Sequence, residues 1–198
     1  MIPAPNENSN GGQPRWLVRE SGIHDRGVFA SRDIIPGYDI IQYIGEKISH
    51  EVADERGLAW EEQAREVGIG AVYLFTLNED WVIDGNLEDN PARLLNHSCN
   101  PNCEAIIYGE GEDAEIWLVS KKVIKQGAEL TFDYGFDLEN YKDHPCRCGS
   151  KKCIGYIVGE EYRTALARRV KAKKLKKKKK DEAKKRKKDG KNGKKKKI

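Results

Sequence analysis

Most of the chain consists of short apolar runs that polar and breaker residues interrupt. Runs of this length, rich in Ile, Val and aromatic side chains and bounded by Gly, Asn, Asp or Pro, are typical of β-strands joined by tight turns. The pattern predicts a mostly β domain with two hairpins, 71–77 with 81–85 and 103–108 with 115–124. The expected strands cover residues 16–19, 38–48, 71–77, 81–85, 103–108, 115–124 and 129–134.

Two segments have a helical period instead. Trp60, Ala64 and Val67 recur at i, i+4 and i+7 among polar residues, which predicts a short amphipathic helix whose apolar stripe packs on the core. Ser49 is a candidate N-cap for this helix. Residues 160–170 also carry apolar side chains spaced four apart and predict a second helix. Beyond them the chain is almost uniformly lysine, and self-repulsion with few apolar residues predicts disorder.

Charge divides the chain into two parts. From Arg168 to the C-terminus there are 20 Lys and Arg residues against three acids, about +17, whereas the other 167 residues hold 16 basic and 29 acidic side chains, about −13. An acidic body suits a cationic substrate such as a lysine-rich peptide, although such charge also simply confers solubility. The basic segment 168–198 is either a solubilising tail or a segment that binds DNA or RNA through the phosphates. Because it has no interleaved aromatic residues for base stacking, we expect such binding to have no sequence preference.

The N-terminal segment and the cysteines bear on the location of the protein. Residues 1–14 are polar and rich in breakers, without the basic and apolar regions of a signal peptide, and predict a disordered leader. The longest apolar runs are far too short to span a bilayer. We therefore expect an intracellular protein of the cytoplasm, nucleoid or nucleus, without a membrane partner. Five cysteines in such a protein indicate metal-bound or free thiols rather than disulfides.

Three motifs carry most of the candidate chemistry. They are Arg-Leu-Leu-Asn-His-Ser-Cys-Asn-Pro-Asn-Cys at 93–103, Glu-Leu-Thr-Phe-Asp-Tyr-Gly-Phe at 129–136, and the cluster Cys146-x-Cys148-x4-Cys153. In this order they resemble the SET-domain protein lysine methyltransferases that carry a post-SET zinc motif. The resemblance covers roughly residues 15–158.

This resemblance implies a β-clip fold in which the Asn-His loop and the final strand are threaded as a pseudoknot, with a short helical insert that shapes the substrate groove. It divides the chain into a disordered leader (1–14), a SET domain (15–137), a post-SET zinc-binding segment (138–158) and a Lys-rich tail (159–198).

Count and spacing of the thiols favour zinc. Three cysteines lie within eight residues in the third motif, and a closed structural zinc site needs four ligands in a tetrahedron. In the family the fourth ligand comes from the Asn-His loop, which leaves Cys103 as a free thiol. His144, two residues before the cluster, is a rival ligand. The resemblance thus implies the ligand set Cys99, Cys146, Cys148 and Cys153.

Methyl transfer to lysine requires a neutral amine. The pKa of free lysine is about 10.4, and an apolar, aromatic-walled channel lowers it by desolvation. The resemblance implies that Tyr134 is the principal catalytic residue and that Tyr73 lines the channel. Phe132 stands where relatives carry Phe or Tyr and leaves room for two or three methyl groups. The plainer interpretation of each is an aromatic residue packed in a sheet.

The cofactor implied by the family is S-adenosylmethionine. A glycine-containing turn, here 21–30, approaches its methionine end, and Gly27 is free to adopt a positive φ there. Asp25 takes the place of the first of two usual glycines. The Asn96 amide is expected to bind the amino-acid end of the cofactor, and His97 the adenine side through its backbone. The resemblance implies cofactor contacts for Arg26, Gly27, Trp81, Arg93, Asn96, His97, Tyr134 and Tyr156.

The sequence therefore predicts a monomeric, S-adenosylmethionine-dependent methyltransferase with one Zn²⁺ ion, which adds two or three methyl groups to lysines of a histone, a histone-like protein or another basic protein. Its own tail is a further candidate substrate. The main alternative is a catalytically inactive SET-fold binding module, for which Asp25 and Ile154 are departures from the family pattern. A second alternative is a nucleic-acid-binding protein that acts through its basic tail.

Overall fold

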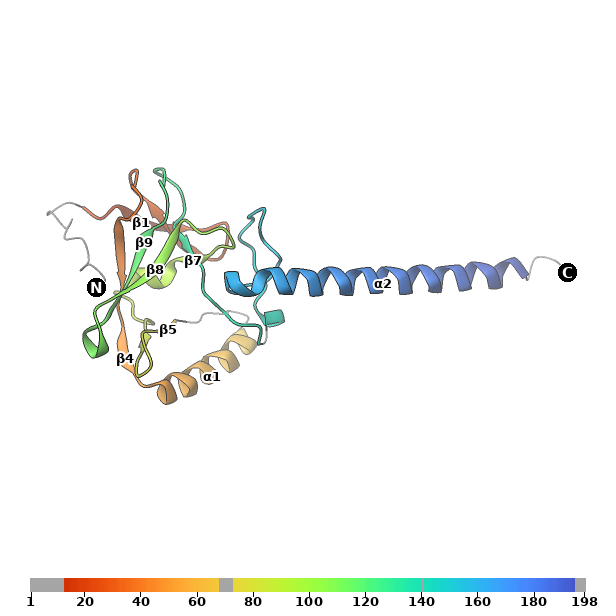
Figure 1. Ribbon diagram of the computed structural model, residues 1–198, viewed down its shortest axis with the longest axis horizontal. Coiled ribbons are helices and arrows are strands. Elements are labelled where there is room, and N and C mark those ends of the chain that lie inside the picture. The colour runs from red at the N-terminus through yellow and green to blue at the C-terminus, as the bar shows by residue number, and fades with distance from the viewer. Residues whose placement is uncertain (1–12, 68–72, 140, 195–198) are drawn as a thin grey trace.

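The computed structural model describes residues 13–67, 73–139 and 141–194, so the leader expected at 1–14 lies almost entirely outside the described residues. Figure 1 shows a body of short strands from which one long helix extends. Four small sheets build the body. Two of them have two strands: β1 (Trp16–Glu20) pairs with β2 (Arg26–Ala30), and β7 (Asn96–His97) pairs with β10 (Thr131–Phe132). The other two have three strands, in the orders β3 (Asp39–Tyr43), β9 (Glu115–Ser120), β8 (Cys103–Tyr108) and β4 (Glu46–Ile48), β6 (Val82–Asp84), β5 (Leu74–Thr76). The helices are α1 (His50–Val67) and α2 (Glu160–Lys194), and the 3₁₀ turns are η1 (Pro91–Leu94), η2 (Gly111–Asp113) and η3 (Tyr141–Asp143).

The mostly β architecture and both hairpins agree with the sequence pattern. Strands β5 and β6 are antiparallel, as are β8 and β9; residues 71 and 72 of the first expected strand lie outside the described residues. The expected strand at 38–48 is divided into β3 and β4, because a Cβ on Gly45 would lie 2.2 Å from the carbonyl oxygen of Asp84. The close approach of these two backbones lets the chain change from one sheet to another at this glycine.

The parallel pair β7–β10 is the contact that assembles the middle of the body. It sets Asn96 opposite Thr131 and His97 opposite Phe132. The backbone N–H of Ser98 donates to the carbonyl of Phe132 at 3.1 Å. Two segments more than thirty residues apart in sequence thus lie side by side, and each brings one of the chemical motifs. The buried core around them contains Val28, Ile34, Leu95, Ile116, Leu118, Ile124 and Leu130.

Helix α1 is attached to the sheet of β4, β5 and β6. The hydroxyl of Ser49 accepts from the backbone N–H of Val52 at 3.4 Å, so this residue does cap the helix. Arg56 bonds the carboxylates of Glu46 at 2.7 Å and Asp84 at 2.5 Å. Trp60, the described member of the predicted apolar stripe, is half-buried against Tyr73; the side chains at 64 and 67 lie outside the described residues.

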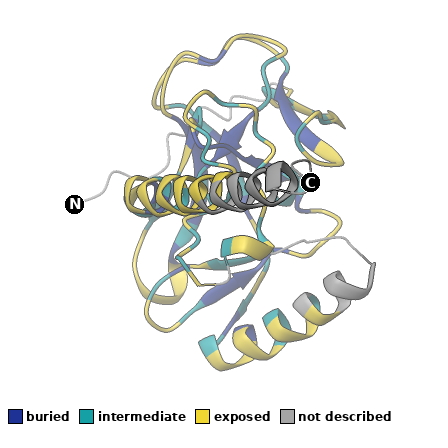
Figure 2. Ribbon diagram, turned by 90° about the vertical axis from the view of Figure 1, so that its right-hand side faces the viewer, coloured by how far each residue is buried: buried dark blue, intermediate teal, exposed yellow. Residues whose placement is uncertain are grey.

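Helix α2 differs from the sequence prediction, which has order end near Val170. It begins at Glu160, where expected, but continues to Lys194 (Figure 1). Lys, Arg, Ala and Leu all have high helix propensity, and no proline interrupts the segment. Figure 2 shows that its described residues are mostly exposed beyond the first turns. Within the described part of the chain, no helix is both long and apolar enough to cross a membrane.

Candidate active site

A cavity of about 370 Å³ lies where β3, β5, η1 and the end of β10 meet. Its size falls in the usual range for sites that bind small molecules or single side chains. Eight of the eleven residues that line it are apolar or aromatic, and Arg93 supplies a cation. The residues that line it are Tyr43, Leu74, Phe75, Thr76, Ala92, Arg93, Leu95, Phe132, Tyr134, Gly135 and Phe136.

The aromatic rings of this wall form a continuous series. The rings of Phe75 and Phe132 are stacked with centroids 5.9 Å apart and an interplanar angle of 10°. Tyr134 follows at 4.9 Å from Phe132, and Phe136 at 5.6 Å from Tyr134. Phe132, Tyr134 and Phe136 all line the cavity, although Gly135 has a φ of 69° and interrupts the extended chain between the last two. Such a wall desolvates any charged group that enters the cavity.

Tyr134 has its hydroxyl inside the cavity. The hydroxyl donates to the backbone carbonyl of Leu95 at 2.9 Å, and the backbone N–H of the same tyrosine donates to His97 Nδ1 at 3.3 Å. Burial raises the pKa of Tyr134 above its ordinary value of 10.0. The hydroxyl is therefore a protonated hydrogen-bond donor with a fixed direction, and it is poorly suited to act as a general base.

Tyr43 is a cavity residue that sequence reasoning did not single out. Its hydroxyl donates to the backbone carbonyl of Tyr73 at 2.8 Å, and burial raises its pKa. A Cβ on Gly85 would come within 2.4 Å of the Tyr43 ring. The sequence offered one signal for Tyr43: it is an aromatic residue two positions before Gly45, where the chain passes from one sheet to the next. Phe75 and Phe136 were also missed, although the two-residue spacing after Phe132 pointed to the second.

The turn between β1 and β2 is tied to β7 by Asn96. Its Nδ2 lies 2.8 Å from Glu129 Oε1 and 3.1 Å from the backbone oxygen of Arg26. A Cβ on Gly27 would come within 2.4 Å of the same Glu129 oxygen, so this glycine makes room for the carboxylate. The expected positive φ belongs instead to Asp25, at 40°. Asp occupies the left-handed region more readily than most residues, so it can take over the position of a glycine.

His97 connects the cavity to the thiols. Its ring is buried, and Nδ1 accepts from the Tyr134 N–H, while Nε2 lies 3.5 Å from Cys99 Sγ. The nearest acidic oxygen, Asp133 Oδ1, is 3.6 Å from Nδ1. Since Nδ1 accepts a hydrogen bond, the tautomer protonated at Nε2 directs its N–H toward the sulfur. The side chain of His97 thus has structural partners on both sides.

Four thiols form the second centre. The Sγ atoms of Cys99, Cys146, Cys148 and Cys153 all lie within 4.8 Å of one another. The Cys99 and Cys146 sulfurs are 3.8 Å apart, and a tetrahedron with Zn–S bonds of about 2.3 Å separates its sulfurs by about the same distance. Hydrogen bonding from Cys146 lowers the pKa of Cys99, and the same contact raises that of Cys146. The donor set therefore suits a cation that neutralises several thiolates together.

The remaining cysteine and the rival ligand are separate from this cluster. Cys103 is buried, and burial raises the pKa of its thiol to about 12. The His144 ring packs edge-on against Phe136 at 5.0 Å. Among the described residues, the group able to hold a metal contains the four cysteines without His144.

The other predicted site residues are divided between the cavity and its surroundings. Arg93 lines the cavity; its guanidinium lies 5.5 Å from the centre of the Tyr73 ring and donates to Asn86 Oδ1 at 2.9 Å. Tyr73 lies beside the cavity, between Trp60 and Arg93. Three other residues do not line the cavity: Arg26 is exposed on β2, Trp81 is half-buried in the turn before β6, and Tyr156 packs against Tyr141 at 4.9 Å.

Fold and site together define a class: small β domains that set an aromatic cavity next to a structural thiol cluster. The family model described as SET domain matches residues 25–135, more than half of the chain. The chain belongs to the SET-domain family, and this confirms the resemblance carried by the three motifs.

Curated relatives agree with this family. The chain is 43% identical over 139 residues to "Histone-lysine N-methyltransferase set1" of Dictyostelium discoideum, covering 70% of this chain and 9% of that protein. It is 42% identical over 137 residues to "Histone-lysine N-methyltransferase set-2" of Caenorhabditis elegans, covering 69% and 9%. The human "Histone-lysine N-methyltransferase SETD1B" is 40% identical over 138 residues, covering 70% and 7%. The chain spans less than a tenth of the length of these relatives.

Proposed function

We propose that this protein transfers methyl groups from S-adenosylmethionine to lysine side chains of a basic protein, such as a histone or a histone-like protein. The observation that carries the proposal is a cavity lined by neighbouring aromatic rings, in which the hydroxyl of one lining residue, Tyr134, is fixed by the carbonyl of another, Leu95. Names of curated relatives that share about 40% identity support the lysine-methylating activity.

Each part of the cavity has a role in this reaction. The bound cofactor supplies an electrophilic methyl group on a sulfonium sulfur. The rings of Phe75, Phe132 and Phe136 exclude water and lower the pKa of an entering lysine, so that its neutral amine keeps a free electron pair. Tyr134 and the carbonyl of Leu95 orient that amine, and Tyr73 lies at the rim of the cavity. Arg93 pairs with the carboxylate of the cofactor. Alignment and desolvation then supply most of the rate enhancement.

The further cofactor contacts are part of the same proposal. The turn with Arg26 and Gly27, together with Asn96, faces the amino-acid end, and the backbone of His97 faces the adenine. Trp81 and Tyr156 are assigned to the periphery of the cofactor, because they lie outside the cavity. One Zn²⁺ ion is held by Cys99, Cys146, Cys148 and Cys153. It fixes the segment 138–158 beside residues 131–136, which we call the catalytic strand.

Phe132 sets the product. Its ring lines the cavity and has no hydroxyl, so it leaves more room there for a methylated amine than a tyrosine would. We propose that the enzyme adds two or three methyl groups. Phe132→Tyr places a hydroxyl in this space and is expected to shift the product to a single methyl group, as measured by the mass of a methylated peptide.

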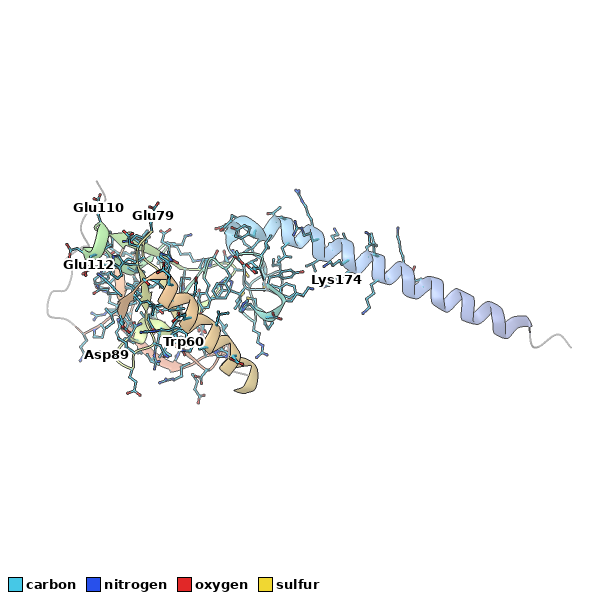
Figure 3. All side chains as sticks on the ribbon, turned by 90° about the horizontal axis from the view of Figure 1, so that it is seen from below. Trp60, Glu79, Asp89, Glu110, Glu112 and Lys174 are labelled. Atoms are coloured by element: carbon cyan, nitrogen blue, oxygen red, sulfur yellow. The ribbon has the colours of Figure 1, made fainter. Side chains whose placement is uncertain are left out.

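The basic helix suggests a second partner. The side chains at 171–179 are all exposed, and seven of these nine residues are lysine. Figure 3 shows Lys174 on the part of α2 that has left the body, whereas Glu79, Glu110 and Glu112 lie at the opposite end. We propose that residues 168–198 bind DNA or RNA without sequence preference. We further propose that the protein is a monomer that works inside the cell, in the cytoplasm, nucleoid or nucleus.

The direction of α2 also limits self-methylation. The helix leads away from the body (Figure 1) and is about 52 Å long for its 35 residues. Its exposed lysines therefore lie out of reach of the cavity in their own chain as long as the helix stays intact. Methylation of the tail, if it occurs, takes place between two copies, and the initial rate of self-labelling should rise with the square of the protein concentration.

The deciding experiment is a transfer assay with labelled S-adenosylmethionine. Wild type and Tyr134→Phe are compared on the protein alone, on histones and on a basic nucleoid or ribosomal extract. Label that disappears in the variant supports the enzyme and identifies the acceptor. The alternative is an inactive SET-fold binding module, and it gains support if the zinc-loaded protein binds no cofactor by calorimetry.

The pH dependence of the rate gives an independent check. Transfer should rise between about pH 7 and pH 9.5 as the substrate amine loses its proton. Burial raises the pKa of Tyr134 above 10.0, so its hydroxyl stays protonated over this range and contributes no downturn. A rate that falls above about pH 8.5 while the protein stays folded contradicts the assigned role of this hydroxyl.

A further inference from the structure

Asp133 lies between Phe132 and Tyr134 in the sequence, and its carboxylate has partners in α2 as well as in its own segment. Oδ2 accepts from the backbone N–H of Glu160 at 3.0 Å and from Arg163 Nη2 at 2.5 Å. Glu160 is the first residue of α2, and the free N–H groups of a helix start need such an acceptor. A residue of the catalytic strand thus caps a helix that begins 27 residues later.

Arg163 closes this contact from the other side. It is 9% exposed, and its three donor nitrogens all have partners. Nε donates to the carbonyl of Val158 at 3.1 Å and Nη1 to the carbonyl of Cys99 at 2.9 Å, in addition to the bond with Asp133. One guanidinium therefore joins the start of α2, the thiol-bearing loop and the catalytic strand. The planar fork of arginine makes three directed bonds that a lysine cannot reproduce.

Packing reinforces the contact. Leu166, one turn after Arg163, and Val158, just before the helix, are both fully buried. The backbone N–H of Gly159 donates to the carbonyl of Phe136, a lining residue of the cavity, at 2.7 Å. The residue that directly precedes α2 therefore contacts the cavity wall itself, beyond the boundary at 158 that the resemblance implies for the zinc-binding segment.

We propose that Asp133 and Arg163 are a positioning pair for the catalytic strand, and that the first turns of α2 belong to the catalytic unit. Asp133 is held on both sides: the bonds to α2 fix Oδ2, and Oδ1 accepts from the backbone N–H of Gly135 at 3.3 Å. Fixing residues 133 and 135 fixes the backbone on which Tyr134 stands, and thereby the direction of its hydroxyl. Misplacement of a catalytic group by an ångström lowers a rate by orders of magnitude.

The test uses full-length, zinc-loaded variants. Arg163→Met keeps the apolar stem and removes the three donors, Arg163→Lys keeps the charge alone, and Asp133→Asn removes the acceptor charge. Thr164→Gln is the matched control, because that residue is exposed and directly follows Arg163 on the same helix. Zinc content and the number of cofactor sites are measured first, so that rates refer to intact protein.

We expect Arg163→Met to lower kcat at least tenfold while KM for a histone peptide changes less than threefold. Arg163→Lys should recover part of this loss, and Thr164→Gln should match wild type. The double variant Asp133→Asn with Arg163→Met should cost no more than the worse single one, since both break the same contact. Additive losses, or kcat within twofold of wild type in Arg163→Met, overturn the proposal.

The kinetic part rests on the proposed methyltransferase function, so a second measurement is independent of activity. Hydrogen exchange read by mass spectrometry should show faster exchange at residues 131–136 in Arg163→Met and unchanged exchange in Thr164→Gln. Inactive wild-type protein with this exchange pattern refutes the enzyme function and retains the pair. Active wild type with unchanged exchange and unchanged kcat in Arg163→Met refutes the pair and retains the enzyme.

Discussion

The first turns of α2 and the remainder of the same helix are held in opposite ways. From Glu160 to Leu166 the helix is fixed by a distant carboxylate, a buried guanidinium and a fully buried leucine. From Lys171 to Lys179 every side chain is exposed. The stability of the first part therefore depends on tertiary contacts. The stability of the second part depends on helix propensity, which must outweigh the repulsion between lysine side chains. One continuous helix thus has a first part that is packed on the β body and a second, cationic part that is exposed to solvent.

The largest effect should come from removing the Zn²⁺ ion that we propose for the four thiols beside the anchored part. A strong chelator, or Cys146→Ser, is expected to release the segment 145–158 and the start of α2, because metal binding and local folding are one equilibrium. The melting temperature should fall by about 10 °C or more. Scanning calorimetry of the zinc-loaded protein provides the measurement. Cys103→Ser should keep its metal, and equal melting temperatures with and without chelator would refute a structural metal.

A pair of leucines tests the comparison directly. Leu166 is fully buried and Leu175 is 56% exposed, and both lie on α2. Leu166→Ala should lower the free energy of unfolding by about 2–5 kcal/mol because it leaves a cavity in the contact with the body. Leu175→Ala should change it by less than about 0.5 kcal/mol. Denaturant titration measures both, and similar losses in the two variants would contradict the division of the helix.

The cationic part should respond to salt. Replacing Lys173, Lys174 and Lys176 to Lys179 by Gln in the full chain removes six exposed cations. Duplex DNA affinity should fall at least tenfold at low salt, and the slope of log K against log salt should decrease by up to about 5. Fluorescence anisotropy gives the slope, while methylation of a short peptide should be unaffected. Unchanged DNA binding in this variant would remove the proposed role of the tail.

The smallest effect concerns helix propensity alone. Ala172 is exposed on the cationic part, and Ala172→Gly should cost about 1 kcal/mol of local helix stability. Circular dichroism should show less helix, whereas the unfolding transition of the body should stay in place. Loss of body stability in this variant would mean that the two parts of α2 fold as one unit.

Several features followed from short-range patterns. The hairpins, the Ser49 cap and the spacing of Phe132, Tyr134 and Phe136 are local, since alternation and capping act over a few residues. Gly27 shows the limit of such reasoning: its need for a missing Cβ was clear, but the atom it makes room for belongs to Glu129. The length of α2 was underestimated because charge repulsion was given more weight than helix propensity.

By itself, the sequence determined the β architecture, the aromatic segment around Phe132 and Tyr134, and the three thiols of the cluster at 146–153. Each of these features depends on residues that are close together in the sequence. The family resemblance added Cys99. Only the tertiary structure decided that Tyr43 lines the cavity and that His97 lies between Tyr134 and Cys99. It also decided that Asp133 caps α2 and pairs with Arg163. The parallel pairing of β7 with β10 brings His97 beside Tyr134. Hydrophobic periodicity specifies which side of a strand is buried, but not which distant strand will cover it.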